Sequence, residues 1–120
     1  MDLSFYKLLH VTGIIVLFIA FGGLTLGARI AGGRQFAHRR LYTLLHGFGL
    51  AFLIFSGFGQ LAKIPHEGMP TWVIIKLVLW LGLGLILSVI LRAPQTHKYI
   101  WATLVAMGVV AGYMGIFKPI

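Results

Sequence analysis

Four long apolar runs constrain the fold of this chain more than any other feature of its sequence. They cover residues 5–28, 41–61, 72–91 and 99–117. A helix needs about 20 apolar residues to cross the hydrocarbon of a bilayer. Backbone polar groups in hydrocarbon must be hydrogen-bonded within the protein, which leaves helices or closed β-barrels. The short alternating strands of a barrel are absent, so the sequence predicts four membrane-spanning helices.

The composition supports lipid, rather than water, as the solvent of this chain. Apolar residues make up 59 % of its 120 residues and charged residues only 10 %. A soluble domain has about 45–50 % apolar and about 25 % charged residues. The length suits one domain. We therefore predict an all-α fold, a four-helix transmembrane bundle that forms a single domain over residues 1–120.

The charges lie at the ends of the apolar runs and predict the orientation of the bundle. Ten Lys and Arg residues face two acidic residues. We exclude nucleic acid as a partner, because basic residues at these positions face lipid phosphates. Cytoplasmic loops are enriched in Lys and Arg, which favours a cytoplasmic first and third loop with both termini outside. Those loops contain six basic residues: Arg29, Arg34, Arg39, Arg40, Arg92 and Lys98. The other side contains four, together with both acids: Lys7, Lys63, Lys76 and Lys118.

Two helical faces have an unusual composition. The second run has a polar stripe that we expect to point into the bundle, because lipid would penalise it. Its members are Arg39, Tyr42, Thr43, His46, Gly49, Gly57 and Gln60. The fourth run has one face with two tyrosines, made by Tyr99, Thr103, Ala106, Val110 and Tyr113, and a nearly opposite face of small residues. Small residues let helix backbones approach closely, within one chain or between copies. A possible homo-oligomer contact is therefore formed by Gly108, Ala111, Gly112 and Gly115.

Three ionisable residues are predicted at membrane depth: His10, His46 and Lys76. Such residues are candidates for function. His10 and Lys76 lie roughly 8 Å below the outer surface, and His46 lies roughly 10 Å deeper than His10. A histidine close to glycine leaves room for a flat ring, and histidine is a common haem ligand. The depth difference disfavours one haem held by both histidines, so His10 is the simpler single ligand.

Each of these residues also has a purely structural interpretation. Either histidine can hydrogen-bond a neighbouring helix, and Lys76 can extend to the interface, bond to Glu67 or pair with a haem propionate. Metal binding by His10 together with His66 is a further possibility, although no ligand spacing supports it. With only two acidic residues, hydrolase chemistry is disfavoured.

The sequence resembles a group of small four-helix bacterial membrane proteins. The residues that carry the resemblance are Leu9-His10, Arg39-Arg40-Leu41-Tyr42, Trp72 with Lys76, and Lys118-Pro119. In length and layout the chain resembles the SirB-like family. It is also similar to HemJ-type protoporphyrinogen oxidases and, more loosely, to CopD-like membrane domains.

The resemblance implies a bacterial cytoplasmic (inner) membrane as the location. Similarity to the HemJ-type proteins implies haem b as cofactor, with the important first-helix histidine at His10 and the third-helix basic residue at Lys76. Residues 15–21 and 96–99 differ from the HemJ-type pattern, and the sequence leaves open whether the chain is an enzyme.

Two hypotheses about function follow from the sequence. In the first, the chain binds b-type haem or acts in membrane redox chemistry or haem metabolism, with His10 as axial ligand, Lys76 beside it and the stripe at His46 as an internal polar path. In the second, it is a non-catalytic membrane protein without a cofactor, such as a small transporter, sensor or assembly partner. The same polar residues then only hold the helices together.

Overall fold

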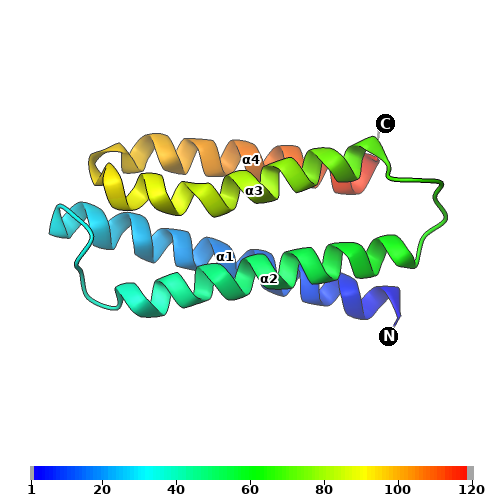
Figure 1. Cartoon of the computed structure of the whole chain (residues 1–120), viewed down its shortest axis with the longest axis horizontal. Coiled ribbons are helices and arrows are strands. Elements are labelled where there is room, and N and C mark those ends of the chain that lie inside the picture. The colour runs from blue at the N-terminus through cyan, green and yellow to red at the C-terminus, as the bar shows by residue number, and fades with distance from the viewer. Residues whose placement is uncertain (1, 119–120) are drawn as a thin grey trace.

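A computed structural model, which describes residues 2–118, shows four long helices and no strand in that range (Figure 1). The helices are α1 (Leu3–Ala31), α2 (Arg39–Ala62), α3 (Thr71–Arg92) and α4 (His97–Phe117), with a short 3₁₀ turn, η1 (Pro94–Thr96), before α4. All four long helices are apolar and long enough to cross a membrane. The all-α, four-helix transmembrane fold is therefore confirmed, and the chain is a multi-pass membrane protein. Pro119 of the C-terminal motif lies outside the described residues.

The first helix, α1, begins and ends at local capping signals, which lie beyond its apolar run. The carboxylate of Asp2 accepts a hydrogen bond from the backbone N–H of Phe5 (2.9 Å) and caps the start of α1. The same helix ends at Gly32, whose φ of 73° is favoured by glycine. Each predicted run lies inside an observed helix, because a helix continues past the hydrocarbon until a capping residue stops it.

His97 and Lys98 are not loop residues, contrary to the sequence-based expectation. They form the first turn of α4, directly after η1. The ring of His97 packs edge-on against Trp101 one turn later, with 5.1 Å between the ring centroids. Pro94 starts the 3₁₀ turn, so the connection from α3 to α4 is tighter than an extended loop.

The helices form two antiparallel hairpins, α1–α2 and α3–α4, and both ends of the chain lie at the same end of the bundle (Figure 1). The α1–α2 pair packs more closely than any other pair of helices. A Cβ atom on Gly13 would lie 2.9 Å from Cβ of Phe52. A Cβ atom on Gly49 would lie 2.8 Å from Cβ of Leu17. The two backbones therefore meet at positions where only glycine fits.

Three hydrogen bonds join the two hairpins across the bundle. His46 Nε2 donates to the carbonyl oxygen of Leu83 (3.1 Å), which links α2 to α3. The indole N–H of Trp80 in α3 donates to the carbonyl oxygen of Leu50 in α2 (2.9 Å), which links the same two helices in the opposite direction. Trp101 of α4 donates to the Thr25 hydroxyl of α1 (2.8 Å). The hairpins are thus held in register by polar groups from both sides.

The buried core is centred on α1. Its fully buried side chains include Leu17, Phe21 and Leu24, which pack against residues from the other helices. The outward faces are apolar as well; Leu85 of α3, for example, is 70 % exposed and Ile30 of α1 is 85 % exposed. Such side chains are stable where lipid covers them, which agrees with four membrane crossings.

The close approach of α1 and α2 can be tested with two glycines of the same helix. We expect Gly49→Ala to lower the free energy of unfolding by about 1–3 kcal/mol, because the new methyl group meets the Leu17 backbone. Gly47→Ala is the matched control, since no atom lies within 4 Å of its Cβ position. Unfolding in a sodium dodecyl sulfate titration, followed by circular dichroism, gives both values. Equal stability of the two variants would contradict the described packing.

Candidate functional site

The residues predicted at membrane depth separate into two places, and the first is at the end of the bundle near the chain termini. There His10 of α1 faces Ser56 of α2, with 2.8 Å between Nδ1 and Oγ. The Ser56 hydroxyl donates its only hydrogen to the carbonyl oxygen of Leu53 (3.3 Å). On this basis we assign Ser56 Oγ as the acceptor of the bond from His10, with the proton of the neutral imidazole on Nδ1 and a lone pair on Nε2.

An imidazole with a bonded Nδ1–H and a bare Nε2 has the form that binds a metal ion. In metal-binding histidines, a hydrogen bond from the other ring nitrogen fixes the ring orientation and the tautomer. Nε2 of His10 has no hydrogen-bond partner among residues 2–118. Gly57 leaves space beside the ring, since a Cβ there would lie 3.9 Å from Cε1 of His10.

Lys76 of α3 joins this end of the bundle. It lies in the second turn of α3 and is partly buried. The two residues that the sequence placed at the same depth thus lie at the same end of the bundle. The structure also adds Ser56, which the sequence analysis did not single out.

His46 occupies a second place, near the centre of the bundle. It is buried, its Nε2–H is bonded to Leu83, and its ring packs edge-on against Phe21 at 5.1 Å. Ten residues of α2 separate it from Ser56, which corresponds to about 15 Å along the helix. His46 and His10 therefore cannot bind one iron atom within a single chain.

The polar stripe of α2 points inward at its middle, as expected. His46 and Gly49 are buried, while Tyr42, Thr43 and Gly57 are partly buried. His46 also contacts α3 through its hydrogen bond, so the stripe contributes to the contact between the hairpins. Its observed role is structural at this position.

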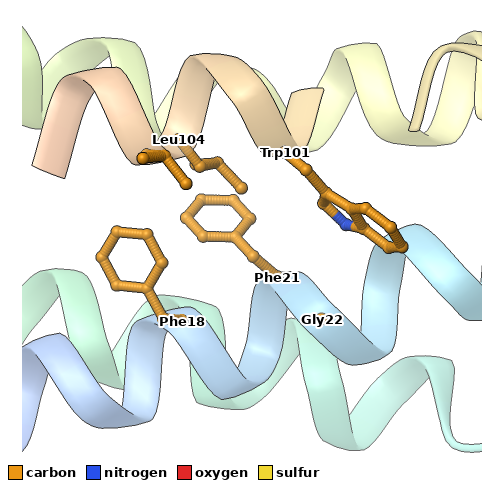
Figure 2. A pocket seen from close by; sticks show the side chains of 6 residues that line it. Phe18, Phe21, Gly22, Trp101 and Leu104 are labelled. Atoms are coloured by element: carbon orange, nitrogen blue, oxygen red, sulfur yellow. The ribbon is translucent and has the colours of Figure 1, made fainter. Parts of the chain in front are cut away.

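Two shallow grooves are open to the surroundings of the bundle. The first, of about 170 Å³, lies between α1 and α4, where Phe18 and Phe21 point toward Leu104 and Trp101 reaches across toward α1 (Figure 2). The second, of about 300 Å³, runs along α2 from Thr43 to Ala51. Sites for drug-sized ligands typically enclose about 300–1,000 Å³. Neither groove is lined by His10, His46 or Lys76.

The structure does not supply a complete metal site from its own side chains. Within residues 2–118, no three His, Asp or Glu side chains gather closely enough to hold an ion. His66 is exposed in the loop between α2 and α3, and its Nδ1 bonds to the carbonyl oxygen of Ile64 (2.9 Å). His10 is thus a candidate for a single ligand, with further ligands supplied by a cofactor or by solvent.

The small residues of α4 face more than one direction. A Cβ on Gly108 would lie 3.7 Å from Phe18 of α1, and one on Gly115 would lie 3.1 Å from the ammonium group of Lys76. Gly112 is exposed, with open space around it. Part of this face therefore packs within the chain, and homo-oligomer formation through it stays a prediction. The Tyr99–Tyr113 face is exposed, with Tyr99 77 % and Tyr113 49 % accessible.

Comparison with protein-family models, curated proteins and solved structures finds no match to this chain. The resemblance to SirB-like, HemJ-type and CopD-like proteins therefore stays a prediction. The function of the chain is therefore inferred from the residues of the site.

The tautomer of His10 provides a direct test of this site. We expect ¹⁵N NMR of the protein in micelles to show neutral His10 protonated at Nδ1, because Ser56 can only accept at that position. Ser56→Ala removes the acceptor and should shift the population toward protonation at Nε2. Ser88→Ala is the matched control, because Ser88 is exposed on α3. Protonation at Nε2 in the unaltered protein would contradict the assignment.

Proposed function

We propose that this chain is a haem-binding protein of the bacterial cytoplasmic membrane, with His10 as an axial ligand of a b-type haem. The observation that carries the proposal is the bare Nε2 of His10, fixed by the bond from Nδ1 to Ser56. Haem iron is commonly held by one histidine nitrogen of this form. The donor atom thus fits the cofactor, whereas His46 lies about 15 Å away along α2, too far to bind the same iron.

The residues around His10 would hold and orient its ring rather than react. Ser56 fixes the ring plane, Gly57 keeps one side of it free of side chains, and Lys76 gives this end of the bundle a positive charge. A bound b-type haem would supply one-electron redox chemistry. A role in membrane redox reactions or haem metabolism is part of the same proposal, and it agrees with the family resemblance.

A visible spectrum tests the proposal. The protein is expressed with added haem, purified in mild detergent and measured with and without reductant. We expect a Soret band that His10→Ala abolishes and that His46→Ala retains, because His46 uses its Nε2 in the bond to Leu83 and lies about 15 Å from Ser56 along α2. His66→Ala is a second control at the same end of the bundle. A folded but colourless protein would refute haem binding, and a band that persists in His10→Ala would refute this ligand.

A non-catalytic membrane protein is the alternative function. It is favoured by the observation that both transmembrane histidines form bonds between helices, His10 to α2 and His46 to α3. These bonds alone account for the presence of histidine in a helix bundle. A colourless, stable protein in the spectral test would support this alternative.

We propose that both termini lie outside the cytoplasmic membrane. The fold supports a shared side, since both termini and the α2–α3 loop lie at one end of the bundle (Figure 1). The chain contains no cysteine, so single cysteines can be placed freely. We expect an impermeant maleimide to label Glu67→Cys in intact cells, and Gln35→Cys only after permeabilisation. Labelling of Gln35→Cys in intact cells, and of Glu67→Cys only after permeabilisation, would contradict the proposed orientation.

A further inference from the structure

Lys76 reaches a gap in the side-chain surface of α4. Its ammonium nitrogen lies 3.1 Å from the position that a Cβ on Gly115 would occupy. A contact this short is tighter than most real Cβ contacts, so a side chain at 115 would force the ammonium group to move. Glycine at this position therefore forms a cradle for the end of Lys76.

A second lysine reaches the same glycine from the end of α4. Lys118 donates a hydrogen bond from Nζ to the carbonyl oxygen of Gly115 (2.8 Å). Its ammonium group also lies over the ring of Trp72, 5.3 Å from the centroid, which is within the range of a cation–π contact. The ammonium groups of Lys76 and Lys118 therefore both lie beside Gly115.

Neither acidic side chain of the chain forms an ion pair with Lys76 or Lys118 in the part that the structure describes. Asp2 caps the first turn of α1 through its bond to Phe5. Glu67 is exposed in the α2–α3 loop. Within residues 2–118 neither carboxylate lies within 4.0 Å of a basic nitrogen, the limit for an ion pair. Two ammonium groups beside the same glycine repel each other, and an anion bound between them would compensate this repulsion.

We propose that Lys76, Lys118 and Trp72 form a binding site for a phosphate group, supplied by an anionic phospholipid. The depth of Lys76, roughly 8 Å into its helix, is within reach of a headgroup for a side chain of this length. Trp72 at the start of α3 provides the amphipathic ring that is common at the membrane interface. The proposed site shares Lys76 with the end of the bundle where His10 lies, but it does not require haem at His10. Free inorganic phosphate is the other source of the same group.

Lipid selectivity measures this site directly. The protein is reconstituted in nanodiscs with phosphatidylglycerol and phosphatidylcholine, and a spin-labelled analogue of each lipid reports its binding by electron paramagnetic resonance. A basic residue near a membrane surface contributes attraction equivalent to about five-fold in affinity. We expect the preference for phosphatidylglycerol to fall about five-fold in Lys76→Gln and in Lys118→Gln, and further in the double variant.

Matched controls separate a built site from general surface charge. Lys7→Gln and Lys63→Gln remove exposed charges near the same end of the bundle and should lower the preference clearly less than Lys76→Gln and Lys118→Gln do. Gly115→Val keeps both lysines but fills the cradle, and should reduce the preference as the lysine variants do. Lys76→Arg keeps the positive charge and should retain most of the preference for phosphatidylglycerol. An equal fall in the Lys7 and Lys63 variants would overturn the proposal.

Two further measurements identify the source of the anion. Displacement of the labelled lipid by millimolar inorganic phosphate, dependent on both lysines, would support the phosphate site with the free ion as ligand. No displacement, with the lysine dependence intact, would support the lipid. The Soret band of haem-loaded protein should not change in Lys118→Gln. Joint loss of haem and lipid binding in that variant would assign the anion to a haem carboxylate and overturn the phosphate assignment.

Discussion

In a bilayer, α1 and α2 gain little by hiding apolar side chains from their surroundings, because lipid tails are equally apolar. Their association depends on close packing and on hydrogen bonds between helices. Gly13 and Gly49 supply the close packing, because each lets the opposite helix approach its backbone. This contact sets the register of the hairpin, and the register places His10 opposite Ser56. The candidate ligand therefore depends on glycines that have no chemistry of their own.

The antiparallel register continues through the whole bundle. On α1 and α2, the residue numbers of three facing pairs add up to 65 or 66: Tyr6 with Gly59, His10 with Ser56, and Leu17 with Gly49. The two links between α2 and α3, His46 with Leu83 and Trp80 with Leu50, add up to 129 and 130. Within each helix pair, these contacts therefore follow one constant antiparallel register. A substitution that shifts one glycine contact would displace the polar pairs along the same helix.

The sequence predicted the helices well, because the apolar length needed to cross a bilayer is a strong and local signal. It also predicted that His10 and Lys76 lie at one depth, since depth follows from position along each helix. It did not predict Ser56, although the hairpin geometry contains the clue. Folding the first two runs about the middle of their connection places His10 opposite a residue within about one turn of Ser56. The exact partner depends on glycine packing, which hydropathy does not encode.

Lys118 shows why the rest of the site could not be found from the sequence. It lies 42 positions after Lys76 and reaches Gly115 within its own helix end, whereas only the antiparallel packing of α3 against α4 brings Lys76 to the same glycine. Gly115 belongs to a stripe of small residues that the sequence offered as a subunit contact. The structure gives this glycine a different use, because the space it leaves is filled by an ammonium group. A small residue in a transmembrane helix can therefore make room for a charge as well as for another helix, and sequence spacing alone does not distinguish the two.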